Sequence, residues 1–273
     1  MIGCDVWRLV GASKMWVPRL ILTILGVGCS DDLTVLFPGG PMLDPDAPEI
    51  IYDFDEGAGS RVFDSSQSGP LAHLAIGDPA QSEWLPGALR IDGTSLQSES
   101  PARDFVRACR RSGEVTVEAW VVPGATVVNG TRRIVSVSSG ASSRNVTLGH
   151  GTLSTEPAAD AYVLRVRTDQ TNNNGLPNLS TGPGAAALAL THIVGTHATE
   201  MVDRIYIDGE LRADARRAGT LENWDAGMSI ILGDEVDVTG DERRFVGELH
   251  YVALYCRALG EDEIRTHFNA GVP

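Results

Sequence analysis

The chain has 273 residues, of which 42% are hydrophobic, and its 22 Lys and Arg against 36 Asp and Glu give a formal net charge of −14. This length and apolar content are enough for one large domain or two small ones, which argues against a disordered chain. Because affinity for nucleic acid depends on Lys and Arg neutralising phosphates, the acidic balance excludes nucleic acid as an expected partner.

Residues 1–28 have the pattern of a secretory signal peptide. Basic residues precede the apolar run 20–28, which is too short to span a bilayer because that takes about 20 apolar residues. Cys29 follows, and residues 25–29 resemble a bacterial lipobox, in which the cysteine is lipidated and becomes the mature N-terminus. We expect export with Cys29 as the lipidation site, and Ser30 favours the outer membrane. An ordinary signal peptide with an incidental cysteine is the alternative.

Residues 29–48 are rich in Pro, Gly and Asp and lack any periodicity, which predicts an acidic tether. From residue 49 onward there is no second linker and no internal repeat. Residues 49–273 are therefore expected to form a single domain, attached to the membrane through the lipid anchor alone.

Strand patterns dominate this domain. Residues 114–122 alternate, with Val115, Val117, Ala119 and Val121 on one face, and β-branched residues favour a pleated surface. Similar patterns occupy residues 132–137, 162–167, 192–196 and 245–255.

A hairpin and a helix complete the prediction. Asp208-Gly209 supplies the positive φ angles of a two-residue type I′ turn, so residues 204–212 are expected to form a β-hairpin. Helical periodicity appears only at residues 261–268, where acids occupy the first turn. About a dozen strands with one terminal helix predict an all-β fold, a two-sheet antiparallel sandwich.

Six segments share the order and spacing of one family. They are residues 52–59 with 62–66, then 84–93, 115–121, 191–196, 206–209 and 247–259. Together they resemble a laminin-G-like jelly-roll domain of the concanavalin A-like lectin/glucanase superfamily. The resemblance implies a jelly-roll sandwich with a short C-terminal helix. It says little about function, since lectins, adhesion modules, pentraxins and glycosidases share this fold.

The enzymes of that superfamily carry a Glu-x-Asp-x-Glu strand, whose alternation places the acids on one face and two of them roughly 5 to 5.5 Å apart. The nearest match is Glu235 with Asp237, but Thr239 or Gly240 stands where the third acid belongs. We therefore expect no catalysis and interpret residues 233–240 as a solvated acidic loop. A divergent glycoside hydrolase is the less favoured alternative.

Many relatives hold one calcium ion, and the resemblance implies Asp64 and Glu248 as its ligands here. Glu248 is a displaced substitute, because His250 and Tyr251 stand where relatives often have acids. For Asp64 the alternative is an Asx-turn residue that caps its own loop.

Sugar sites combine exposed aromatic rings with amides that bind hydroxyl groups. Trp84 and Trp224 lie next to turn residues, and Asn172 and Asn174 belong to an amide-rich loop. These four are the candidate ligand-binding residues, although packing in the core is the alternative for both tryptophans. Arginine supplies all but one of the basic residues, which we interpret as compositional bias rather than a binding patch.

Cys109 and Cys256 remain in the domain as an even pair in an oxidising compartment. A disulfide between them and two separate buried thiols are both open alternatives. His192 and His197 bracket a strand and are expected to pack or hydrogen-bond rather than bind metal. The predicted protein is an exported, non-catalytic binding module for carbohydrate or a cell-envelope partner; a structural or adhesive interaction domain of the envelope is the alternative.

Overall fold

The computed structural model describes residues 47–153, 155–235 and 243–273. Leu43–Pro273 is one compact unit. Cys29 and the segment 1–28 lie outside the described residues, as does nearly all of the segment 29–48, so the boundaries of the signal peptide and the tether stay predictions. Within the described part of the chain, no helix is long and apolar enough to cross a membrane.

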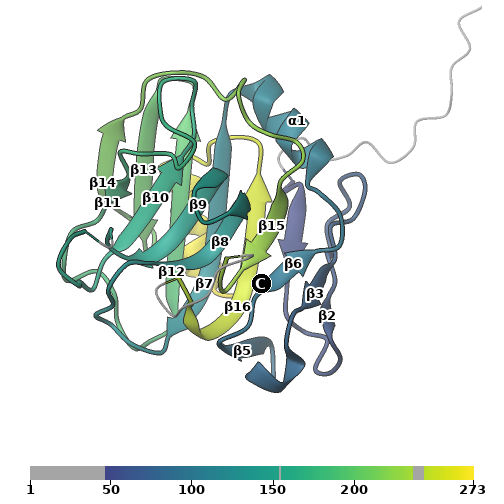
Figure 1. The fold of residues 1–273 in the computed structure, drawn as a ribbon. Coiled ribbons are helices and arrows are strands. Elements are labelled where there is room, and N and C mark those ends of the chain that lie inside the picture. Colours follow the sequence, from purple (N-terminus) through teal and green to yellow (C-terminus); the bar gives the residue numbers. More distant parts are fainter. Residues whose placement is uncertain (1–46, 154, 236–242) are drawn as a thin grey trace, which may run out of the picture. The chain divides into compact units, whose positions relative to one another are not determined.

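Two antiparallel sheets pack face to face (Figure 1). In the first sheet the strand order is β14-β13-β12-β7-β16-β5-β4, with β1 also paired to β16. The bounds are β1 (Ile50–Tyr52), β4 (Ser82–Leu85), β5 (Ala88–Asp92), β7 (Val115–Pro123), β12 (Thr191–Ala198), β13 (Val202–Ile207), β14 (Glu210–Arg216) and β16 (Val246–Tyr255).

The second sheet has the order β11-β10-β9-β8-β15-β6-β3-β2. Its bounds are β2 (Arg61–Val62), β3 (Leu74–Ile76), β6 (Leu96–Ser98), β8 (Thr131–Gly140), β9 (Ser143–Gly151), β10 (Tyr162–Val166), β11 (Leu179–Ser180) and β15 (Ser229–Leu232). Neighbours such as β8 and β15 are distant in sequence, so long connections cross between the sheets. This architecture confirms the predicted two-sheet antiparallel sandwich.

The hydrophobic core lies between the sheets. Val115, Val117, Ala119 and Val121 of β7 all contribute to it, which confirms the predicted alternation. Opposite them lie core residues of the second sheet, such as Leu148 and Leu164. The two sheets approach so closely that a Cβ on Gly195 of β12 would lie 2.8 Å from Leu164.

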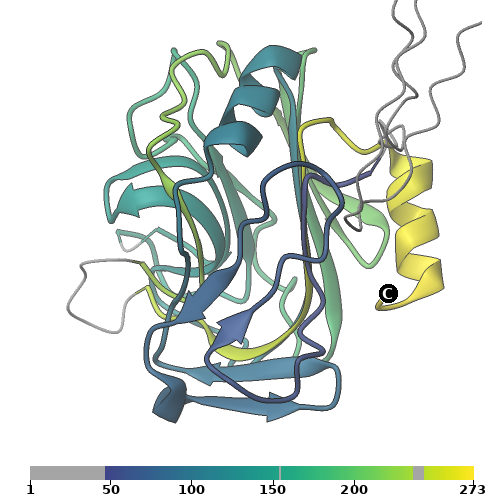
Figure 2. The ribbon, with the colours of Figure 1, turned by 90° about the vertical axis from the view of Figure 1, so that its right-hand side faces the viewer.

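The C-terminal helix α2 (Glu261–Ala270) covers the outer face of the first sheet (Figure 2). Ile264 of α2 is fully buried in a cluster with Trp120, Val194 and Tyr251. This second cluster explains why both faces of β7 are buried. The helix that the sequence predicts is therefore confirmed, and it protects a sheet face that would otherwise be exposed.

The hairpin β13–β14 turns at Asp208-Gly209, whose φ angles are +52° and +77°. These are the positive values that a type I′ turn requires, so the predicted hairpin is confirmed.

A second helix, α1 (Arg103–Ser112), contradicts the expectation that helical periodicity appears only at the C-terminus. Its buried residues Phe105 and Val106 lie one turn before the buried Cys109, and Gly113 ends the helix at φ +74°. Four arginines occupy the remaining face, so the apolar stripe is narrow and the segment is polar on average, although its apolar residues follow a clear helical period. A short 3-10 turn, Pro79–Gln81, precedes β4.

Candidate ligand-binding site on the second sheet

The outer face of the second sheet is polar yet buried. Ser136 of β8, Thr147 of β9 and Arg165 of β10 lie side by side in register across three strands. Their sequence neighbours Val137, Val146 and others face the core, so alternation directs these three outward. All three are nevertheless buried.

Three arginines converge on this face from three adjacent strands. Arg133, Arg144 and Arg165 belong to β8, β9 and β10, and each is at most 5% exposed. Glu235 lies beneath them, with its Oε2 3.4 Å from Arg133 Nε and 3.7 Å from Arg144 Nη1. Among the described residues, Glu235 is therefore the carboxylate that both arginines share.

Glu235 corrects one expectation from the sequence. Its segment is expected to be a solvated acidic loop, but Glu235 is only 4% exposed, and its Oε1 accepts a 2.6 Å hydrogen bond from Ser138. The physical reason is charge pairing: Glu235 follows β15, which places it against the arginines of β8 and β9. Asp237, the other predicted carboxylate of this segment, lies outside the described residues.

Burial and the repulsion between like charges lower the pKa values of these arginines. Burial lowers the pKa of Arg144 to about 9, and repulsion from Arg133 and Arg165 acts in the same direction. Burial likewise lowers the pKa of Arg165 to about 10, with Arg133 and Arg243 adding repulsion. Both values lie well above neutral pH, so the cluster remains positively charged under ordinary conditions.

A hollow of about 170 Å³ opens over the arginines. Its lining is Gly130, Thr131, Arg133, Ala141, Leu153, Thr155, Arg165, Asn174, Leu176 and Arg243. Arg165 donates hydrogen bonds from Nη1 to Asn174 Oδ1 at 3.2 Å and from Nη2 to Thr131 Oγ1 at 2.6 Å. The Nε of Arg165 has no hydrogen-bond partner among the described residues. The hollow thus presents both a cation and neutral polar groups.

The amide-rich loop contributes one of its two predicted residues to this hollow. Asn174 lines it directly. Asn172 instead shapes the loop, because its Oδ1 accepts hydrogen bonds from the backbone N–H groups of Asn174 and Leu176, each at 3.0 Å. Asn172 therefore positions Asn174 and is not among the residues that line the hollow.

The tryptophans do not join this site. Trp224 is 2% exposed, its indole N–H donates to the carbonyl of Arg167, and its ring packs against Phe105. Its expected role in stacking on a sugar is therefore wrong, since neither ring face is accessible. Trp84 is half-buried on β4 of the first sheet, and its indole N–H donates to the carbonyl of Gly59. Trp84 thus belongs to the first sheet, whereas Asn174 lies in the loop that joins β10 and β11 of the second sheet.

Comparison of the sequence with known protein families identifies the family of this chain. The family profile described as the concanavalin A-like lectin/glucanases superfamily matches residues 93–265, more than half of the chain. The chain belongs to the concanavalin A-like lectin/glucanase superfamily. No match is found among curated proteins.

Solved structures share the superfamily fold at low sequence identity. The binding domain of botulinum neurotoxin serotype D/C matches with a TM-score of 0.62 and 14% identity, covering 83% of this chain and 52% of that one. A structure of botulinum neurotoxin type C, whose cell entry depends on interaction with two ganglioside molecules, matches with a TM-score of 0.61 and 13% identity, covering 83% of this chain and 51% of that one. A Trypanosoma rangeli sialidase in complex with sialic acid matches with a TM-score of 0.53 and 17% identity, covering 80% and 32%. The chain thus spans about half the length of the neurotoxin domains, and the likeness shows the fold.

The calcium ion that the superfamily resemblance implies does not fit the two predicted ligands. Asp64 already accepts three backbone hydrogen bonds: Oδ1 accepts from Ile51 and Ser66, and Oδ2 accepts from Ala72. This is the Asx-turn role that the sequence leaves open. Glu248 pairs with Arg90 at 2.8 Å and with His250 at 3.1 Å.

The residues that hydrogen-bond to Asp64 are different from the two residues that pair with Glu248. Within the described part of the chain, no three His, Cys, Asp or Glu side chains form a group able to hold a metal ion. We therefore assign no role to calcium through these two residues.

A separate network of titratable groups lies on the outer face of the first sheet, under α2. Glu118 of β7 is hydrogen-bonded to His192 Nε2 at 2.7 Å, to the Tyr255 hydroxyl at 2.9 Å and to His267 Nδ1 at 3.1 Å. Burial raises the pKa of Glu118, but the hydrogen bonds from His192 and His267 outweigh it and hold the pKa at about 2. Sequence reasoning missed Glu118 because its partners lie 74 to 149 positions away.

The two histidines at the ends of β12 hydrogen-bond, as the sequence predicts. His192 contacts Glu118, and its ring stacks on Trp120 with centroids 4.6 Å apart. His197 Nδ1 lies 2.8 Å from Asp203, which also accepts from Arg217 Nε at 2.7 Å. Both groups stabilise the first sheet.

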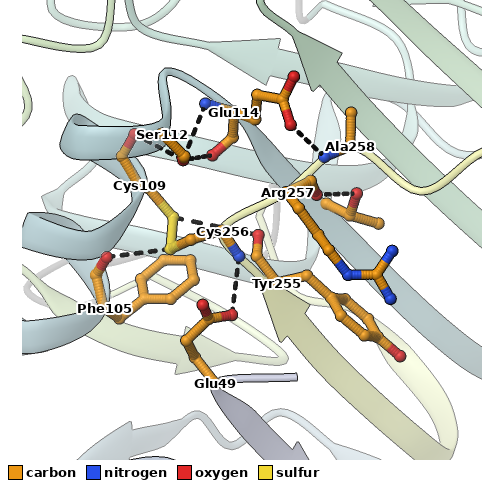
Figure 3. The surroundings of a disulfide bond; sticks show 10 residues. Glu49, Phe105, Cys109, Ser112, Glu114, Tyr255, Cys256, Arg257 and Ala258 are labelled. Carbon is orange, nitrogen blue, oxygen red and sulfur yellow. Dashed lines mark hydrogen bonds between the residues drawn. A yellow bond between two sulfur atoms is a disulfide. The ribbon is translucent and has the colours of Figure 1, made fainter. Parts of the chain in front are cut away.

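Cys109 and Cys256 form a disulfide, with a Cα–Cα distance of 4.4 Å (Figure 3). The sequence leaves open a disulfide or two separate thiols, and the structure contains the disulfide. Cys109 lies on α1 and Cys256 follows β16, so the bond ties the helix to the first sheet. Glu49 reinforces this junction, because its Oε2 accepts a 2.7 Å hydrogen bond from the backbone N–H of Cys256.

Proposed function

We propose that the protein is a non-catalytic carbohydrate-binding module whose sugar site is the hollow over β8, β9 and β10. The observation that carries this proposal is the convergence of Thr131, Arg165 and Asn174 on one hollow at a sheet face. A few precisely placed donors and acceptors in a concave site are what sugar hydroxyls need for specific recognition. Two structural neighbours support the same ligand class, since the type C neurotoxin interacts with gangliosides and the sialidase structure holds sialic acid.

A glycosidase is the competing function. Retention of configuration needs two carboxyl groups roughly 5 to 5.5 Å apart, and inversion needs roughly 6.5 to 9.5 Å. The described lining of the hollow consists of arginine, threonine, asparagine and apolar residues. Glu235 beneath it is held in place by Arg133, Arg144 and Ser138. This arrangement favours binding over hydrolysis.

We further propose that the protein is exported and held at the outer membrane through lipid on Cys29. The Cys109–Cys256 disulfide supports an oxidising compartment. The basic and apolar pattern of residues 1–28 supports the route.

The first experiment is a glycan array probed with the purified protein, with Asn174→Ala as the test variant. We expect saturable binding to one class of saccharide and a clear loss of binding in Asn174→Ala. Asn269→Ala is the matched control, because Asn269 is exposed on α2 beside the other sheet and should leave binding unchanged. Absence of binding to every saccharide would contradict the proposal. Release of reducing sugar from a bound saccharide would instead establish the glycosidase.

A further inference from the structure

The charge around the hollow is opposite in sign to that of the chain. The whole chain carries a formal charge of −14. At the hollow, by contrast, Arg133, Arg165 and Arg243 line the surface, Arg144 lies against Glu235 below, and Glu235 is the carboxylate that pairs with Arg133 and Arg144. Among the described residues this leaves a local excess of positive charge.

Arg165 is the buried arginine of this hollow whose hydrogen bonds all go to uncharged groups. It is 5% exposed, and its two Nη atoms donate to an uncharged amide and an uncharged hydroxyl. Its Nε has no partner and the residue has no ion pair among the described residues. A buried charge normally requires an opposite charge, because removing an ion from water is costly. Among the described residues, the charge of Arg165 thus lacks a directly paired carboxylate, and an anion in the hollow would supply one.

The geometry favours an oxyanion over a simple ion. A guanidinium is a planar fork of donors that matches the two oxygens of a carboxylate or the oxygens of a sulfate. Thr131 and Asn174, beside the fork, offer the neutral groups that would bind ring hydroxyls. The hollow, at about 170 Å³, is smaller than the roughly 300 to 1,000 Å³ of sites for drug-sized ligands, so it suits a single sugar residue.

We infer that the hollow recognises an acidic sugar, whose carboxylate or sulfate oxygens bind Arg165 with support from Arg133 and Arg243. This inference rests on the proposed carbohydrate-binding function and names its ligand class. The negative charge of the rest of the chain repels long polyanions at a distance, so a single acidic residue is favoured over a highly sulfated chain. The lowered pKa values of Arg144 and Arg165 accord with cations that are crowded together without enough counter-charge.

The test is calorimetric titration of the full chain with matched sugars. The probes are glucuronic acid and N-acetylneuraminic acid for the carboxylate arm, galactose 6-sulfate for the sulfate arm, glucose and galactose as neutral counterparts, and inorganic sulfate alone. We expect binding in one or both acidic arms, with the neutral counterparts at least tenfold weaker. A charged hydrogen bond of the usual strength corresponds to about a tenfold to hundredfold change in affinity.

Two variants test the assigned arginines. Arg165→Gln should weaken acidic-sugar binding about tenfold to hundredfold. Because Arg165 is buried, Arg243→Gln, at the half-buried rim, provides a second variant whose fold is less at risk, and it should weaken binding several-fold. Arg212→Gln, exposed on β14 of the other sheet, makes the same change in net charge and should have no effect.

The outcomes separate this inference from the function on which it rests. Equal affinity for acidic and neutral sugars would overturn the inference and leave the carbohydrate-binding proposal standing. Inorganic sulfate binding as tightly as the acidic sugars would also overturn it, since the site would then be an anion site without sugar recognition. Unchanged binding in both Arg165→Gln and Arg243→Gln would place the acidic group elsewhere. No binding to any saccharide would overturn the proposed function itself.

Discussion

Glu118 and Glu235 are two buried carboxylates that obtain their counter-charge in different ways. Glu235 lies against Arg133 and Arg144, and the pKa of Arg144, although lowered to about 9 by burial, stays above neutral pH. Glu118 is surrounded by His192, His267 and a tyrosine hydroxyl, so its surroundings change with pH. The two sheet faces should therefore respond differently to acid and base.

The first prediction concerns the pH dependence of stability through Glu118. Its folded pKa is lowered from 4.5 to about 2, so its contribution is present above about pH 4.5 and is lost as the pH falls toward 2. The pKa of His267 is raised above 6.5, mainly by its hydrogen bond to Glu118. The contribution of His267 is thus present below about pH 6.5 and is lost as the pH rises through the raised pKa. Both contributions are complete between about pH 4.5 and 6.5.

Glu118→Gln should lower the free energy of unfolding by roughly 2 to 4 kcal/mol in that window and flatten its dependence on pH. Urea denaturation over a pH series measures both effects. Glu83→Gln is the control, because Glu83 pairs with Arg90 on the surface and its loss should cost less than about 1 kcal/mol. A Glu118→Gln profile parallel to that of the wild type would contradict this account.

Helix α1 and strand β16 are the two elements joined by the disulfide, across a sequence separation of 147 residues. The helix lies at one end of the sandwich and buries Phe105, Val106 and Cys109. Phe105 also contacts Trp224, so the helix, the loop after β14 and the end of β16 form one packed corner. The bond therefore fixes an element that contributes little apolar surface of its own.

The second prediction is that the double variant Cys109→Ala, Cys256→Ala loses about 2 to 5 kcal/mol of unfolding free energy. The reason is that a cross-link over a long loop restricts the unfolded chain. Urea denaturation under oxidising conditions measures the loss, and the wild type treated with reductant should approach the variant. Free thiols found at both Cys109 and Cys256 by peptide mass spectrometry of the oxidised, denatured wild type would contradict the bridge.

At the scale of the whole molecule, the two outer faces of the sandwich differ. α2 closes the first, with Ile264 and Phe268 packed on Trp120. The second carries the charged hollow over β8, β9 and β10. The two outer faces therefore differ, because a helix covers one and the other offers a polar hollow.

The third prediction concerns the proposed lipid anchor. In a bacterium that expresses the full chain, Cys29→Ser should move the protein from the membrane fraction to the soluble fraction. Mass spectrometry of the N-terminal peptide should find lipid on Cys29 in the wild type. Cys4→Ser is the matched control and should leave attachment unchanged, because Cys4 lies within the predicted signal peptide. An unmodified wild-type peptide would contradict the lipid anchor.

Local patterns predicted most of the fold. The alternation in residues 114–122, the Asp208-Gly209 turn and the acidic start of α2 all depend on neighbours within a few positions, and the structure confirms all three. Helix α1 and strand β9 are absent from the prediction because few of their own residues are apolar. The apolar stripe of α1 is narrow, and β9 mixes polar residues with Gly149 and Gly151.

The sequence by itself determined the sandwich, because side-chain alternation and turn angles are properties of short segments. Only the tertiary structure decided the site. Arg133 and Glu235 are 102 positions apart, and strand pairing brings them into contact. The tertiary structure likewise decided that Trp224 is buried and that both carboxylate oxygens of Asp64 accept backbone hydrogen bonds. Burial, charge pairing and hydrogen-bond satisfaction depend on which strands become neighbours, and no local pattern contains that information.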